Sequence, residues 1–297
     1  MQIKQIYETA ISLGLKNDLR GQAVIEQETV KLRTGQAEEI YPDSLIISGR
    51  PENKVKKILA GIDVGAVEIA SAKYYYKNID LIISHHPLGA ALNGLPRVVG
   101  SQTEILKNYG VAEAKIKDKI NEASLAIKRE LAGDNYLKEF QLSTALKVAL
   151  MTVHAPADNA AAALLKQTLK NSQTLAEAVA AMDGLPEFKE AKKHGFAPFI
   201  ACGEPAGAIG QICYSEITGG EESSPAVYQE IANAGFKTII APHLSKKFFD
   251  AAKRAGLNVI FSGDITTDSL GLNVFLDELA KNKIEIIACS GLIRPDN

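Results

Sequence analysis

Apolar residues recur along this chain with two alternating periods, and each period predicts a different element. Helical spacing predicts amphipathic helices at Ile3–Leu13 and Val24–Lys31. Short, nearly continuous apolar runs predict buried strands at Val55–Asp63 and Asp80–Ser84. Because the segment Ala66–Tyr75 between these strands suits a helix, the pattern is that of a βαβ unit with parallel strands.

The alternation continues to the end of the chain. Further strands are predicted at Ser44–Gly49, Leu146–Val153, Phe196–Cys202, Gln211–Ile217, Lys237–Ile240, Val259–Ser262 and Ile284–Ala288. Further helices are predicted from Pro156 onward and at Pro225–Asn233, Lys246–Ala255 and Leu270–Lys281, with one long solvated helix at Val111–Phe140. Gly219–Ser224 predicts a turn before a helix.

The predicted fold class is α/β, with two α/β domains and largely parallel sheets. The stretch Asp183–Pro198 carries Gly, Pro and a run of Lys, and it is the best candidate for a boundary. We therefore expect a first domain over 1–182 and a second over 183–297, with the alternative that the two are intertwined.

Composition narrows the functional classes. The 297 residues carry 33 Lys+Arg against 35 Asp+Glu, so the formal charge of -2 predicts neither a nucleic-acid partner nor an anionic membrane surface. No apolar run approaches the ~20 residues of a membrane span, and residues 1–7 do not resemble a signal peptide. The 3 Cys show no CxxC spacing, which favours a reducing, cytoplasmic location.

Histidines cluster at predicted strand ends, where ligands collect in open α/β sheets. His85 and His86 directly follow one buried strand and His154 follows another. Imidazole is a preferred ligand of zinc, iron, nickel and copper. A capped strand end with surface histidines explains the pair equally well.

Carboxylates accompany these histidines. Asp158 falls in the first turn of the helix after His154, where it also suits the helix dipole. Asp264 and Asp268 are four residues apart on one helix face, and Asp264 is alternatively an N-cap. Two carboxylates on one face repel unless a positive charge lies between them. The mixed N/O donors together predict a pair of divalent ions such as zinc, manganese or iron.

Four segments in order, KKILAGIDVG, DLIISHHPLG, TVHAPAD and NVIFSGDITTDSLGLN, resemble the Nif-three-like family (Ngg-one-interacting factor three-like, GTP cyclohydrolase I type 2 homologues). The resemblance runs from about Asp43 to Leu279. It implies a two-domain α/β protein with a dinuclear metal centre between the domains, assembled as a homo-oligomer, usually a ring-shaped hexamer.

The resemblance also implies ligand roles for His85, His86 and Asp158, with His154 nearby. The late family motif Gly-His-x-x-x-Glu has Asp264 and Asp268 here in place of His and Glu. A shorter carboxylate at Asp268 reaches about one methylene less far, and a more anionic site favours manganese, magnesium or iron over zinc. His243 stands about where the family has a carboxylate, either compensating for the histidine absent at 264 or capping a strand.

These residues predict a metal-dependent hydrolase of a small molecule. The metals would be held by His85, His86, Asp158 and Asp268 with Asp264 completing the set, while His154 or His243 relays protons. Asp63 is expected either to orient one of the paired histidines or to cap a helix. The family label indicates a nucleotide or another phosphate-containing substrate, although no GxxxxGK[ST] loop is present. The alternatives are a non-enzymatic metal-binding or regulatory protein and, further, a chain with a disabled centre.

Overall fold

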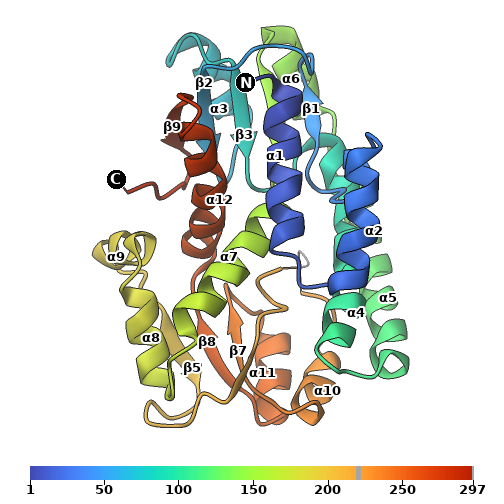
Figure 1. The fold of residues 1–297 in the computed structure, drawn as a ribbon, viewed down its shortest axis with the longest axis vertical. Helices are drawn as coiled ribbons and strands as arrows, with labels where there is room; N and C mark the ends of the chain where they lie inside the picture. Colours follow the sequence, from blue (N-terminus) through green and yellow to red (C-terminus); the bar gives the residue numbers. More distant parts are fainter. Residues whose placement is uncertain (219–221, 296–297) are drawn as a thin grey trace.

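The computed structural model describes residues 1–218 and 222–295, so the predicted turn at 219–224 lies partly outside the described residues. Within them the fold is mixed α/β, with two sheets at opposite ends of the molecule (Figure 1). The strands are β1 Ile46–Ser48, β2 Lys57–Gly61, β3 Leu81–Ser84, β4 Ala149–Thr152, β5 Phe199–Cys202, β6 Gln211–Cys213, β7 Phe236–Ala241, β8 Asn258–Phe261 and β9 Glu285–Cys289. The α-helices are α1 Ile3–Lys16, α2 Gln22–Arg33, α3 Ala66–Tyr74, α4 Leu95–Asn108, α5 Glu113–Glu130, α6 Lys138–Leu146, α7 Ala155–Leu169, α8 Leu175–Asp183, α9 Pro186–Lys193, α10 Val227–Asn233, α11 Lys246–Arg254 and α12 Asp264–Ala280, and short 3₁₀ turns occupy Ala37–Glu39, Gly89–Gly94 and Leu131–Gly133.

The first sheet has the order β1-β4-β3-β2-β9, and only its edge strand β1 runs antiparallel to its neighbour. All four residues of β3 are buried, because helices cover both faces of the sheet. Leu81 and Ile83 face the core shared with α1 and α12, while Ile82 faces the core shared with α3. This two-sided burial explains why the strand reads as a continuous apolar run.

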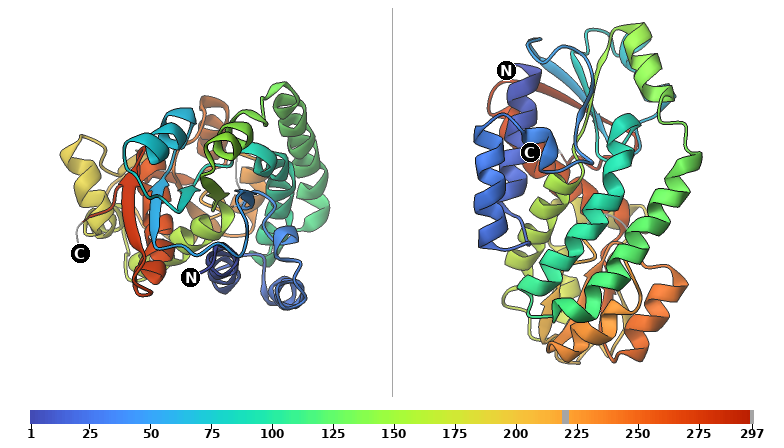
Figure 2. Two further views of the ribbon diagram at one scale, coloured as in Figure 1. Left: turned by 90° about the horizontal axis from the view of Figure 1, so that it is seen from above. Right: turned by 90° about the vertical axis from the view of Figure 1, so that its right-hand side faces the viewer.

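The second sheet has the order β5-β8-β7-β6, with β6, β7 and β8 parallel and β5 antiparallel at the edge. One face packs against α7 and α8 through Ile240 and Ile260. The other face packs against α10 and α11 through Ile239 and Val259. The hairpin of α4 and α5 runs along the side of the molecule and reaches this second core with Ile116 (Figure 2).

Helices α7 and α12 lie side by side between the sheets and contribute to the core of each one. Their contact is close because Gly271 has no side chain: a Cβ there would lie 2.1 Å from the carbonyl oxygen of Ala157. Since α7 follows β4 and α12 follows β8, the carboxyl ends of strands from both sheets face the space where these helices begin. The predicted α/β class with two largely parallel sheets is confirmed.

Three features differ from the predictions. The single long helix at Val111–Phe140 is wrong, because the chain breaks at Gly133 and continues as the separate helix α6. Helix α4 was not predicted, and neither were α8 and α9, of which α9 falls inside the stretch proposed as a boundary. Pro186 begins α9 and Gly195, with φ +89°, follows its end.

None of the described helices is both long and apolar enough to cross a membrane.

Candidate metal centre

The two adjacent histidines leave β3 in fixed positions. The backbone N–H groups of His85 and His86 donate to the carbonyl oxygens of Gly61 (2.9 Å) and Ile62 (3.1 Å), so the chain stays hydrogen-bonded beyond the strand end. The Ser84 hydroxyl donates to the carbonyl of His86 at 2.8 Å. These three hydrogen bonds fix the direction in which the backbone leaves the strand.

His85 lies at the centre of the cluster and is 1% exposed. Its Nδ1 pairs with the carbonyl oxygen of Val153 at 3.0 Å, which requires the proton on Nδ1. Its Nε2 then faces the carboxylates of Asp158 (3.3 Å) and Asp268 (3.5 Å). An imidazole oriented in this way offers one free lone pair, at Nε2.

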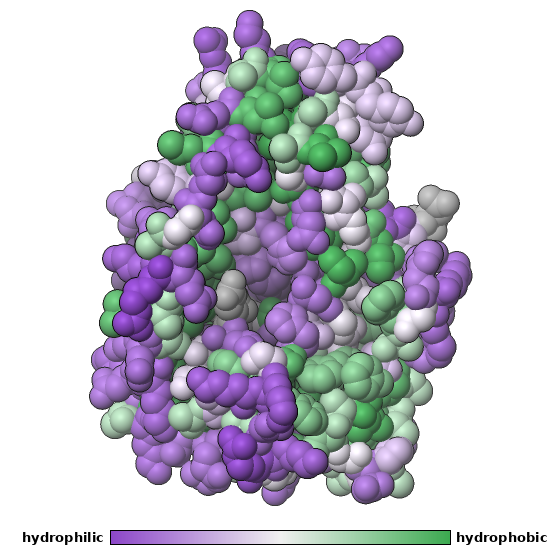
Figure 3. Space-filling view, turned by 180° about the vertical axis from the view of Figure 1, so that it is seen from behind, coloured by the Kyte–Doolittle hydropathy of each residue, from purple (hydrophilic) through white to green (hydrophobic). Residues whose placement is uncertain are grey.

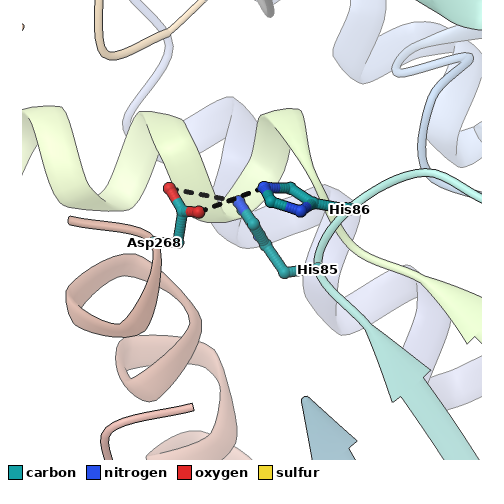
Figure 4. A group of neighbouring side chains, drawn as sticks. All are labelled: His85, His86 and Asp268. Carbon is teal, nitrogen blue, oxygen red and sulfur yellow. Dashed lines mark ion pairs between the residues drawn. The ribbon is translucent and has the colours of Figure 1, made fainter. Parts of the chain in front are cut away.

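His86 is oriented by a different partner. Its Nδ1 lies 2.7 Å from Asp63 Oδ1, and its Nε2 lies 3.2 Å from Asp268 Oδ2. Figure 4 shows the Asp268 carboxylate, from the first turns of α12, pointing toward both imidazoles. One oxygen of Asp268 faces His85 and the other faces His86.

His154 and Asp158 come from the corner between β4 and α7. The Nδ1 of His154 lies 2.7 Å from Oδ2 of Asp43, a carboxylate with 0% exposure that also accepts the backbone N–H of Ala155 at 3.2 Å. The Nε2 of His154 lies 3.7 Å from Asp158 Oδ2. Helix α7 begins at Ala155 with Pro156 in its first turn, and this turn places Asp158 on the same side as His154.

Among the described residues, two groups have ligand atoms close enough to hold a metal ion, namely His85, His86 and Asp268, and His85, His154 and Asp158. In each group the ligand atoms lie within 4.8 Å of one another. Asp268 Oδ2 is buried and accepts no well-aligned hydrogen bond from the described residues. Three inward Nε2 atoms and two buried carboxylates fit a divalent cation of the zinc, manganese or iron type.

The charges in the cluster depend on one another. Burial by itself lowers the pKa of His85, but the charge of Asp268 and the carboxylate oxygens of Asp158 and Asp268 raise it well above its usual value. Burial also lowers the pKa values of His86 and His154. The net shift is upward in both, because Asp268 raises the pKa of His86 and Asp158 and Asp43 raise that of His154. Burial would raise the pKa of Asp268, but His85 and His86 hold it well below its ordinary range. In the metal-free protein the carboxylates therefore favour protonation of the three histidines.

Asp264 and His243 lie at the rim and belong to neither group. Asp264 Oδ1 is 3.7 Å from His243 Nε2, and their side chains are 44% and 67% exposed. Gly263, with φ +83°, occupies the N-cap of α12, so Asp264 does not cap the helix. Burial and the neighbouring charge of Asp268 raise the pKa of Asp264.

Most of the cluster lines a cavity of about 870 Å³. Figure 3, which views the molecule from behind relative to Figure 1, shows a hydrophilic hollow at mid-height. The cavity includes His86, His154, Asp158 and Asp268, together with the rim residues Asp264 and His243. The opposite wall comes from α5, and the end near the second sheet comes from the segments after β6 and β7. This volume suits a small molecule.

The structure thus brings His85, His86, His154, Asp158 and Asp268 together and leaves Asp264 and His243 at the edge. Asp43 was missed by the sequence reasoning. Its only signal is a carboxylate directly before the predicted strand at Ser44–Gly49, and its partner His154 lies 111 residues away. Asp63, for which two roles were open, lies against His86.

No protein-family model matches the sequence, and no curated protein matches it. Solved structures do. A NIF3 superfamily protein from Sphaerobacter thermophilus superposes with a TM-score of 0.74 at 22% identity, covering 84% of this chain and 91% of that chain. Reduced HcgD from Methanocaldococcus jannaschii has a TM-score of 0.53 at 14% identity, covering 87% of this chain and 96% of that chain. Protein ybgI, described as of unknown function, has a TM-score of 0.52 at 15% identity, covering 91% and 98%. At these identities the likeness establishes the fold.

Proposed function

We propose that this chain, which has the fold of NIF3 superfamily proteins, is a hydrolase of small molecules that works with two divalent metal ions. The observation that carries the proposal is the convergence of three imidazole Nε2 atoms and two buried carboxylates, of which His86, His154, Asp158 and Asp268 line a cavity and His85 lies buried behind them. A site that served only to stabilise the fold would need no open space beside it.

The geometry supports two unequal metal positions. His85 occurs in both groups, but its single free nitrogen can bind only one ion. We assign it, with His154 and Asp158, to a buried position. His86 would hold the second ion together with Asp268, whose two oxygens face His85 and His86. A position held by few protein side chains would leave room for water and substrate.

Metal ions in such a site would lower the pKa of bound water and polarise the bond to be cleaved. The chain itself provides the orientation: Val153, Asp63 and Asp43 each fix one imidazole through Nδ1. The neutral Nε2 of each imidazole is thereby directed at the reacting region. His243, at the rim beside Asp264, is placed to carry a proton between the cavity and solvent.

The substrate class is proposed to be a phosphate-containing small molecule such as a nucleotide. Its support is the resemblance to the Nif-three-like family, together with Lys119, Arg129 and Lys247, which line the cavity and form no ion pair with any described residue. A ring-shaped homo-hexamer and a cytoplasmic location are proposed on the sequence alone.

Elemental analysis of the purified protein, beside Asp268→Ala, is the first test. About two metals per chain that fall in the variant would support the dinuclear centre and justify assays on aryl phosphate esters and nucleotides. Bound metal without any turnover would favour the alternative, a metal-binding or regulatory protein. Absence of metal after incubation with manganese, zinc and iron would contradict both.

A further inference from the structure

A carboxylic acid outside the metal-ligand cluster lies on the wall of the same cavity. Glu216 follows β6, in a segment contributed by the second sheet, and its side chain is partly buried. Its neighbour Ile217 also lines the cavity, as does Glu222. The histidines and aspartates of the candidate metal centre come instead from β3, α7 and α12. Glu216 is therefore positioned independently of the metal ligands.

The surroundings of Glu216 disfavour its charged form. The hydroxyl of Tyr228 on α10 is buried and has no hydrogen-bond partner among the described residues, and its position near the Glu216 carboxyl only partly offsets this effect. Glu222 brings a second negative charge, and its own carboxylate accepts hydrogen bonds from the backbone and side chain of Ser245. The buried thiol of Cys213 is a further titratable neighbour. Along the described chain, no Lys or Arg forms an ion pair with Glu216.

Burial raises the pKa of Glu216 to about 7, the charge of Glu222 acts in the same direction, and the Tyr228 hydroxyl opposes both. A carboxyl group of this kind is protonated in a large fraction of molecules near neutral pH. Proton transfer is most efficient when the pKa of the donor lies near the working pH.

We propose that Glu216 is the general acid of this cavity, the residue that gives a proton to the leaving oxygen of a bound ester. This role rests on the proposed hydrolase function. The water that attacks loses one proton as the bond to the leaving oxygen breaks. Glu216 transfers its carboxyl proton to that oxygen and becomes a carboxylate, and solvent returns the proton released by the water. The expected substrate is an ester with a poor leaving group, one whose oxygen is basic and departs slowly unless it is protonated.

The test compares two esters that differ only in the leaving group, p-nitrophenyl phosphate and phenyl phosphate, with metal-loaded wild type and Glu216→Gln. The nitrophenolate ion leaves without protonation, whereas the phenolate benefits from an acid. We expect kcat/KM of Glu216→Gln to fall about 100-fold or more for phenyl phosphate and only a few-fold for p-nitrophenyl phosphate. An equal loss on both esters, or no loss on either, would overturn the role.

Two further measurements keep this test independent of the proposed function. Glu230→Gln, on the same helix as Tyr228 but outside the cavity, is the control; Glu230 is also partly buried, and it pairs with Lys115 at 3.4 Å. Infrared difference spectra of wild type minus Glu216→Gln should show a carboxyl that titrates near pH 7. If the metal-loaded wild type hydrolyses no ester, the hydrolase proposal fails. Glu216 is then judged by its titration, and a midpoint like that of an ordinary Glu, about 4.3, overturns its role as a proton donor.

Discussion

His86 and His85 are adjacent in sequence but differ in burial and in their partners. His85 is 1% exposed, while the His86 side chain is 34% exposed at the cavity. We therefore expect His86→Ala to lose only the second ion, taking the metal content from about two to about one per chain, and to abolish hydrolysis. Elemental analysis and ester turnover measure both effects. His194→Ala, an exposed histidine after α9, is the control, and retention of both metals in His86→Ala would contradict the assignment.

Asp43 and Asp63 each hold one imidazole, but only Asp43 is buried. Asp43 has 0% exposure, whereas the Asp63 side chain is 65% exposed. We expect Asp43→Asn to weaken metal binding by about 10- to 100-fold, because His154 loses a charged acceptor that fixes its orientation. Water can replace the exposed carboxylate of Asp63, so Asp63→Asn should have a smaller effect. Competition with a chelator for bound manganese or zinc measures both, and equal losses would contradict the distinction.

The paired charges of the centre also make the stability of the metal-free protein depend on pH. The pKa values of His85, His86 and His154 are raised by folding, so their contribution is complete below about pH 6.5 and is lost as the pH rises through the raised values. The pKa of Asp268 is lowered, so its contribution is complete above about pH 3.9 and is lost as the pH falls through the lowered value. Calorimetry of the chelator-treated protein should show that these groups contribute most to the free energy of unfolding between about pH 3.9 and pH 6.5. Asp268→Asn should flatten both sides of the curve, and an unchanged curve would contradict the coupling.

At the scale of elements, the contact between α7 and α12 controls where the two aspartates lie. A Cβ at Gly271 would meet the carbonyl of Ala157 at 2.1 Å, next to Asp158 and one turn from Asp268. Gly271→Ala should destabilise the protein by about 1–3 kcal/mol or more by forcing the helices apart, and it should weaken metal binding. Denaturant unfolding and metal competition test this.

Gly100 on α4 is the matched control for that substitution, because nothing lies within 4 Å of a Cβ built there. Gly100→Ala should stabilise the protein by about 0.4–1 kcal/mol, since alanine restricts the unfolded chain without a clash. A Gly271→Ala variant with wild-type stability would show that the helices can adjust without cost.

The elements and the site were not equally predictable from the sequence. Strands such as β3 were found because burial on both faces leaves a continuous apolar run, and the histidines were found because they follow those runs directly. Helix α6 was merged with α5 because the range 111–140 as a whole is rich in Ala, Lys and Glu, and this outweighed the turn residues Gly133, Asp134 and Asn135 between the two helices. The pairing of Asp43 with His154 depends on β1 lying beside β4, and no local pattern encodes such a long-range contact.

On the scale of the whole molecule, the chain returns to the first sheet after building the second. Strand β9 pairs with β2 along its full length, although the two are more than 200 residues apart. Helix α12 adds Leu272, Phe275 and Leu276 to the core of the first sheet. The separation into 1–182 and 183–297 therefore remains a proposal, and the intertwined alternative makes a distinct prediction.

We expect that fragment 1–182 does not fold alone, because β2 would lack its neighbour and the core around Ile58 and Leu81 would be open. Fragment 1–195 keeps α8 and α9 whole, so its failure would not result from a cut within α8. Near-ultraviolet circular dichroism and amide exchange should show no fixed tertiary structure in either fragment, while the full chain unfolds in one transition. A natively packed 1–182 fragment, with two separate transitions in the full chain, would instead support independent domains, each bringing its own residues to the metal centre.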